Sequence, residues 1–182
     1  YENLGTLEFL YEEGKFYFIE MNTRLQVEHP ITEAITGLDI VREQISLSAG
    51  NKLSFNQNQV NFFGHAIECR INAENPQTFL PYPGQITQFH PPGGLGVRVD
   101  SGIYSGYTIP PFYDSLIAKL IVHGENRKHC LLKLNQAIQE MVIEPIPSTL
   151  TLHRDILNTK DMINANYDIK WLEDVFLKNE KK

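Results

Sequence analysis

The strongest constraint on the fold lies in residues 20–30, where charged, amide and apolar side chains alternate up to a proline. In an extended segment successive side chains point to opposite faces, so Arg24, Gln26 and Glu28 would share one face, opposite the apolar residues between them. One face would pack against the protein, and the other would present a cation, an amide and a base. Such a set suits chemistry on an anion.

Two segments rich in aromatic and branched residues precede this run and flank a glycine. Residues 6–11 and 16–21 are expected to form strands, joined by a turn in which Gly14 takes a positive φ. If the turn has three residues, Glu8 and Glu20 emerge on one face as diagonal neighbours, whereas a turn of two or four residues would separate them. Without the adjoining run, scattered glutamates on a solvent-exposed face would explain both positions.

The remaining sequence mixes helical and strand patterns, which predicts an α+β fold with a boundary near residues 50–62. The helices are expected to be capped by Asp39, Ser148 and Asp168. They are expected at residues 30–37, 40–49, 128–141, 148–158 and from residue 168 onwards. Strands are expected near residues 66–73, 86–90, 97–100 and 116–123.

Composition excludes several classes of function. The 182 residues carry a net charge of −6, which argues against a nucleic-acid surface, because such a surface needs a basic stripe. The sequence contains no apolar run of about 18 residues, as a membrane span requires, and no secretory leader pattern. We therefore expect a cytoplasmic protein. Cys69 and Cys130 lack metal-binding spacing and are expected to be free thiols.

The run EMNTRLQVEHP resembles the signature of the biotin-dependent carboxylases within the ATP-grasp superfamily. Two later blocks, HAIECRINAE at residues 65–74 and YDSLIAKL at residues 113–120, are similar to segments that follow in the same order in biotin carboxylase. The resemblance implies that residues 1–55 are the C-terminal end of an ATP-grasp domain, with antiparallel strands and helices. Residues 56–182 would be the biotin carboxylase C-terminal domain, an antiparallel sheet with flanking helices.

The resemblance also implies a metal site. Glu8, Glu20 and Asn22 would hold Mg²⁺ or Mn²⁺ together with ATP. This role agrees with the residue types, since Mg²⁺ is usually bound by one or two carboxylates and the phosphates of a nucleotide.

For bicarbonate, the resemblance implies binding by Arg24, Gln26 and the backbone N–H of Val27, with Glu28 as the general base. The planar fork of donors on an arginine matches a planar anion better than a lysine does. Arg70 would stabilise the charge that develops on biotin or on the leaving anion. On the residues alone, an ion pair of Arg70 with a nearby glutamate explains it about equally well.

In the implied reaction, bicarbonate attacks the γ-phosphate of MgATP, and the resulting carboxyphosphate releases CO₂ to biotin on a carrier protein. This is the first half-reaction of acetyl-CoA carboxylase in fatty acid biosynthesis. The implied partners are the biotin carboxyl carrier protein, carboxyltransferase subunits, a second copy in a homodimer, and an N-terminal part of the same chain. Because the glycine-rich lid of ATP-grasp enzymes would precede Tyr1, the chain alone is expected to be inactive.

Other functions remain open at this point. The chain could belong to another ATP-grasp ligase, such as one half of a carbamoyl-phosphate synthetase, or serve as a non-catalytic module for carrier binding and dimerisation. The residues do not distinguish acetyl-, propionyl- or methylcrotonyl-CoA carboxylase from pyruvate carboxylase. The charged tail Lys178–Lys182, without a biotin-attachment motif, favours a separate biotin carboxylase subunit of the bacterial type. His29 is expected to form a hydrogen bond near the start of a helix.

Overall fold

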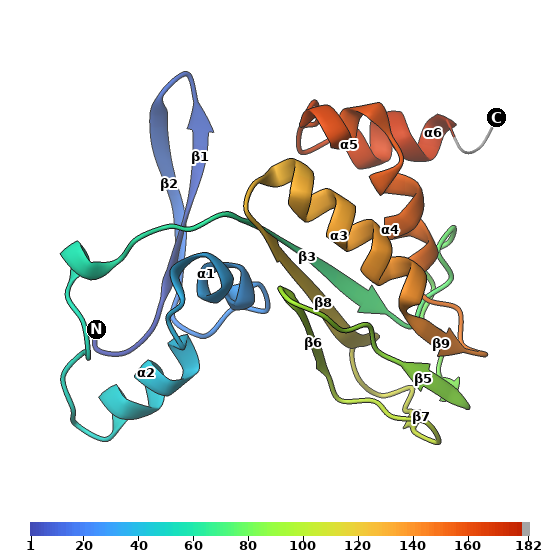
Figure 1. Cartoon of the computed structure of the whole chain (residues 1–182), viewed down its shortest axis with the longest axis horizontal. Helices are drawn as coiled ribbons and strands as arrows, with labels where there is room; N and C mark the ends of the chain where they lie inside the picture. Colours follow the sequence, from blue (N-terminus) through green and yellow to red (C-terminus); the bar gives the residue numbers. More distant parts are fainter. Residues whose placement is uncertain (180–182) are drawn as a thin grey trace. The chain divides into compact units, whose positions relative to one another are not determined.

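The computed structural model describes residues 1–179, and the chain divides into two compact units, the first ending at Phe63 and the second beginning at Gly64 (Figure 1). Every strand pair in both units is antiparallel, and helices accompany the strands. The predicted α+β class is therefore confirmed. Most of the charged tail, residues 180–182, lies outside the described residues.

The first unit begins with the hairpin of β1 (Thr6–Glu12) and β2 (Lys15–Asn22), which confirms the two predicted strands (Figure 1). Of the turn lengths left open by the sequence, the structure has the two-residue turn. Glu12 pairs directly with Lys15, and Glu13 and Gly14 form a two-residue turn with φ values of 49° and 81°. Positive φ at both central residues is the geometry that matches the natural twist of a hairpin.

A β-bulge then shifts the register of this hairpin. Phe9 pairs with Phe18, but Glu8 pairs with Glu20, so Ile19 is an extra residue on β2. In a regular register, without the bulge, Glu8 would face Ile19, and the two glutamates would point to opposite sides of the hairpin. The bulge therefore brings Glu8 and Glu20 to the same face of the hairpin, although a two-residue turn was expected to separate them.

Two helices follow the hairpin, as predicted. Helix α1 (His29–Thr36) has a proline in its first turn and ends at Gly37, which has a φ of 71°. Helix α2 (Ile40–Ser48) is capped by Asp39, whose side chain accepts a hydrogen bond from the Arg42 N–H at 2.8 Å. A short 3₁₀ turn, η1 (Gln57–Gln59), completes the unit.

The second unit is built on an antiparallel sheet with the strand order β3–β8–β6 and on two further strand pairs (Figure 1). Its strands are β3 (His65–Asn72), β4 (Gly84–Gln85), β5 (Gln88–His90), β6 (Val97–Ser101), β7 (Thr108–Ile109), β8 (Leu116–Gly124) and β9 (Val142–Glu144). Its helices are α3 (Arg127–Glu140), α4 (Leu150–Leu157), α5 (Lys160–Asn164), the π-helical η2 (Leu172–Phe176) and α6 (Leu177–Asn179).

The core of this unit lies between α3 and the sheet. Helix α3 contacts β8 and β3, and its buried face presents Leu134 and Ile138, which are four residues apart and so lie on one side of the helix. Strand β8 supplies Leu120 and Val122, both fully buried. The helix at residues 128–141 and the strand near residues 116–123 were both predicted from the sequence.

The start of α4 differs from the prediction. Thr149, not Ser148, occupies the N-cap position, and its side chain makes no capping bond within the helix. The Thr149 hydroxyl is used elsewhere, because it bonds to the backbone of β3. Within residues 1–179 no helix is long and apolar enough to cross a membrane.

Candidate functional site

The centre of the candidate site is the carboxylate pair of the hairpin. Asn22 Nδ2 donates to Glu8 Oε1 at 2.8 Å and to Glu20 Oε1 at 3.1 Å. Glu8 is half-buried and Glu20 is exposed. One amide therefore holds two carboxylates together, and Asn22 stays available as a ligand through its own oxygen.

This donor set fits Mg²⁺. Its groups are two carboxylates and one amide oxygen, the hard oxygen ligands that Mg²⁺ prefers when nucleotide phosphates complete the coordination. In the described part of the chain, no group of three or more His, Cys, Asp and Glu side chains gathers in a metal-binding arrangement. Glu8 and Glu20 supply two carboxylates, so a cation bound by them would need further ligands such as phosphate oxygens.

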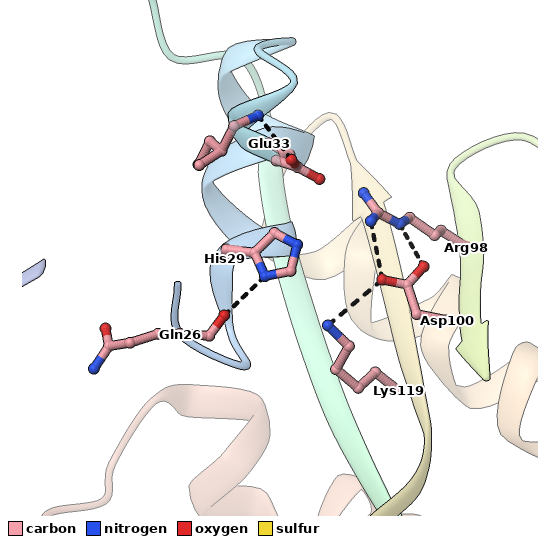
Figure 2. Close-up of polar contacts among 7 residues, drawn as sticks. Gln26, His29, Glu33, Arg98, Asp100 and Lys119 are labelled. Carbon is pink, nitrogen blue, oxygen red and sulfur yellow. Dashed lines mark hydrogen bonds and ion pairs between the residues drawn. The ribbon is translucent and has the colours of Figure 1, made fainter. Parts of the chain in front are cut away.

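The loop after β2 is joined to this pair through Gln26. The Gln26 Nε2 donates to Glu8 Oε1 at 2.8 Å, on the same oxygen that Asn22 binds. The Gln26 carbonyl in turn lies 2.8 Å from His29 Nδ1, as predicted for His29 at the start of a helix (Figure 2). Gln26 therefore connects the carboxylate pair to the start of α1.

The loop is not extended up to Pro30, which was the condition for Arg24, Gln26 and Glu28 to share one face. Strand β2 ends at Asn22, and a turn at Val27 and Glu28 leads into α1, with Glu28 at a φ of −83° and a ψ of 7°. The turn is closed by the His29 N–H, which donates to the Gln26 carbonyl at 3.2 Å. Since Pro30 is accommodated in the first turn of α1, helix formation begins before an extended run can develop.

The remaining predicted residues of this loop have different exposures. Arg24 is exposed, and its Nη1 donates to the Leu25 carbonyl at 3.3 Å. Val27 is half-buried, whereas Glu28 is exposed and directly precedes α1. Arg24 and Glu28 are thus both accessible to a ligand from solvent.

Arg70 belongs to the second unit, where it lies on β3 with an exposed side chain. Lys119 on β8 pairs with Arg70 on one side and with Asp100 of β6 on the other, so these residues form a row across one face of the sheet. The sequence analysis did not identify Lys119 or Asp100. The signal was present, since Lys119 is a charged residue between Ala118 and the apolar run of residues 120–122.

Asp100 is the charge centre of this row. The Arg98 Nε and Nη2 donate to its two carboxylate oxygens at 2.7 and 2.9 Å, and Lys119 Nζ lies 3.5 Å from its Oδ2 (Figure 2). Burial is the largest single influence on the pKa of Asp100 and raises it, but the hydrogen bonds and charges of Arg98 and Lys119 together outweigh burial. The pKa of Asp100 is therefore lowered, and the carboxylate stays charged at neutral pH.

Comparison with known proteins identifies the family. A family model described as the biotin carboxylase C-terminal domain matches residues 68–174. A second model, described as the ATP-binding domain of the carbamoyl-phosphate synthase L chain, matches residues 1–56. Because the first match spans more than half of the chain, the chain belongs to the biotin carboxylase C-terminal domain family.

Similar proteins agree with this assignment. Over 173 residues the chain is 55% identical to a biotin carboxylase of Allochromatium vinosum, covering 95% of this chain and 38% of that protein. A solved biotin carboxylase–β,γ-ATP complex from Campylobacter jejuni matches with a TM-score of 0.91 and 45% identity, covering 94% of this chain and 39% of the other. A third match is the biotin carboxylase domain dimer of the Hydrogenobacter thermophilus 2-oxoglutarate carboxylase, in complex with MgADP, ADP and bicarbonate. Its TM-score is 0.90 at 45% identity, and the match covers 93% of this chain and 38% of that chain. The chain thus spans about two fifths of the length of these relatives.

Proposed function

We propose that this chain is the C-terminal portion of a biotin carboxylase, which carboxylates biotin on a carrier protein with MgATP and bicarbonate. The observation that carries the proposal is the hydrogen bond from Gln26 to Glu8, since it joins the loop after β2, where bicarbonate is proposed to bind, to the carboxylate pair. The similarity to biotin carboxylases along 95% of the chain supports the same function. In this proposal residues 1–55 close an ATP-grasp domain, and residues 56–182 form the biotin carboxylase C-terminal domain.

Glu8, Glu20 and Asn22 would hold Mg²⁺ or Mn²⁺ at the phosphates of ATP. When bound, the cation would neutralise negative charge on the phosphoryl group that is transferred. The hydrogen bonds of Asn22 to both carboxylates keep the two side chains close together without any metal. Their mutual repulsion is thereby reduced before the cation arrives.

Arg24, Gln26 and the backbone N–H of Val27 would bind bicarbonate, and Glu28 would remove its proton. The resulting anion attacks the γ-phosphorus of ATP, so that ADP leaves and carboxyphosphate forms. Carboxyphosphate then releases CO₂ and phosphate, and the phosphate takes the proton from the biotin nitrogen that attacks CO₂. Arg70 would stabilise the negative charge on biotin in this last step. The protein contributes positioning and charge rather than a nucleophile, as is usual in phosphoryl transfer.

The proposed partners follow from this reaction. Biotin would arrive on a biotin carboxyl carrier protein, and a carboxyltransferase would consume the product, as in acetyl-CoA carboxylase and fatty acid synthesis. A homodimer is proposed as well, because the related 2-oxoglutarate carboxylase domain is described as a dimer.

A second candidate is an ATP-grasp ligase that uses ammonia rather than biotin. It is favoured by the match of residues 1–56 to the carbamoyl-phosphate synthase model. The match of residues 68–174 to the biotin carboxylase domain favours biotin as the acceptor.

The test measures ADP release by the full-length enzyme with bicarbonate, with and without free biotin. Biotin is expected to stimulate ADP release, and Arg24→Ala is expected to abolish the stimulation. Arg42→Ala is the matched control, because Arg42 is an exposed arginine on α2 outside the site. Turnover that is independent of biotin but stimulated by ammonia would instead support the ligase.

Glu28→Gln tests whether the chain is catalytic at all. Loss of a general base is expected to slow bicarbonate-dependent ADP release by about 10²–10⁴-fold, with dimer assembly unchanged. A variant with the full rate would favour a non-catalytic role in carrier binding and dimerisation.

A further inference from the structure

The backbone carbonyl of Arg70 accepts two side-chain hydrogen bonds from the region where α4 begins. Thr149 Oγ1 donates to it at 3.1 Å, and His153 Nε2 lies 2.8 Å from the same oxygen. A carbonyl oxygen has two lone pairs and accepts both donors together. Strand β3 lies at the edge of its sheet. The two side chains therefore satisfy the Arg70 carbonyl in place of an N–H from a neighbouring strand.

Thr149 also pairs with the backbone of Asn72, two residues further along β3. The Thr149 N–H donates to the Asn72 carbonyl, and the Asn72 N–H donates to Thr149 Oγ1, both at 3.0 Å. The Thr149 hydroxyl therefore accepts from Asn72 and donates to Arg70. Because Thr149 is buried, water does not substitute for these bonds.

His153 completes the arrangement from one turn further along α4. Burial is the main cause that lowers its pKa, and the hydrogen bond to the Arg70 carbonyl opposes the shift. The ring is therefore neutral at pH 7 and donates through its Nε2–H. The donor assignments at the Arg70 carbonyl are consequently the same throughout the neutral range.

We propose that Thr149 and His153 are positioning residues for Arg70, which fix the backbone from which its guanidinium reaches the charge on biotin. This inference rests on the proposed function, in which Arg70 acts in the carboxylation of biotin. Strand β8 holds one side of β3, where Arg70 lies opposite Lys119, and the bonds to Thr149 and His153 hold the outer side. The two bonds therefore help to determine where the Arg70 side chain originates. Displacing a catalytic group by about 1 Å can cost on the order of 10²-fold in rate.

The test uses the full-length enzyme and compares two rates, ATP cleavage with bicarbonate alone and carboxylation of free biotin. Thr149→Val keeps the shape of the side chain and removes the hydroxyl, and His153→Leu removes the ring donor. Each is expected to lower kcat/KM for biotin on the order of tenfold. Each should also lower the ratio of biotin carboxylation to biotin-independent ATP cleavage.

Conservative variants separate positioning from general loss of structure. Thr149→Ser keeps the hydroxyl and His153→Gln keeps a donor at a similar reach, so both should recover most of the lost rate. Thr151→Val is the matched control, because Thr151 is an exposed threonine of the same helix. It should leave both rates unchanged.

The decisive measurement repeats Thr149→Val and His153→Leu in an Arg70→Ala background. If the two residues act through Arg70, their effects on biotin carboxylation disappear there. Undiminished effects in that background, or equal losses in both rates, would overturn the inference. If Thr149→Val does not fold, the comparison of His153→Leu with His153→Gln still decides the question. A parent enzyme without any biotin-dependent activity would instead refute the proposed function itself.

Discussion

Glu8 lies directly opposite Glu20 across the hairpin because Ile19 is an extra residue in β2. The tight turn alone would pair Glu8 with Ile19 and place the carboxylates on opposite faces. The bulge changes the face that Glu20 presents, and Asn22 then bonds to both carboxylates. Bulges often occur next to active sites, where they redirect a side chain in this way.

This arrangement predicts how the full-length enzyme depends on magnesium. Glu8→Gln and Glu20→Gln each remove one charge from the proposed metal site, so the Mg²⁺ concentration for half-maximal ATP cleavage should rise by at least about tenfold. Glu12→Gln is the matched control, because Glu12 is an exposed glutamate of the same strand. An unchanged Mg²⁺ dependence in both site variants would contradict the metal assignment.

The core of the second unit predicts a contrast between two leucines of α3. Leu134 is fully buried, whereas Leu132 is 63% exposed. Leu134→Ala is expected to lower the free energy of unfolding by about 2–5 kcal/mol, because it leaves a cavity. Leu132→Ala should change it by less than about 0.5 kcal/mol. Urea unfolding of both variants measures the difference, and similar losses would mean that α3 packs through another face.

Asp100 predicts a pH-dependent contribution to stability. Its pKa is lowered in the folded state, so its stabilisation is complete above the ordinary carboxyl pKa and is lost as the pH falls through the lowered value. Asp100→Asn should therefore destabilise the chain at pH 7, and the difference from the parent should vanish in acid. The effect is expected to be at most about 1 kcal/mol, because Arg98 is 45% exposed and solvent screens the pair.

The control for Asp100→Asn is Asp174→Asn. This variant breaks the exposed ion pair between Asp174 of η2 and Lys178 of α6. Its effect on the free energy of unfolding should be smaller than that of Asp100→Asn. A stability difference for Asp100→Asn that persists unchanged at low pH would show that its charge is not the cause.

Both cysteines are expected to resist alkylation in the folded protein. They are buried and free, burial raises the pKa of Cys69 to about 12, and burial likewise raises that of Cys130. The thiolate is the reactive form, so iodoacetamide at neutral pH should modify neither residue until the chain is unfolded. Peptide mass spectrometry measures the modification, and rapid labelling of Cys69 in the native enzyme would contradict its position in the core.

The sequence was most informative where one residue determines the local backbone. Gly37 and Asp39 predicted the end of α1 and the start of α2, since a left-handed glycine and an N-cap aspartate depend on nearby residues alone. The helical and strand patterns likewise predicted the helix α3 and the strand β8. Local chemistry therefore gave most of the regular elements.

The sequence was less informative where tertiary contacts decide between similar local structures. The bulge at Ile19 adds one residue without any composition signal, so the pairing of Glu8 with Glu20 could not be derived. Thr149 and Ser148 are both good N-cap residues, and the choice between them depends on β3, far away in the sequence. The conformation of the loop at Gln26 likewise depends on Glu8, with which it forms a hydrogen bond.

The hairpin that carries the carboxylate pair has almost no core of its own. All of the large apolar side chains of β1 and β2 are exposed, namely Leu7, Phe9, Leu10, Tyr11, Phe16, Tyr17, Phe18, Ile19 and Met21. A two-stranded hairpin alone is marginally stable in water, so any contact that covers these side chains also orders Glu8 and Glu20. Cation binding and coverage of the hairpin are then thermodynamically coupled, and each strengthens the other by the same factor. The affinity for magnesium would thus report how completely the aromatic surface around the site is covered.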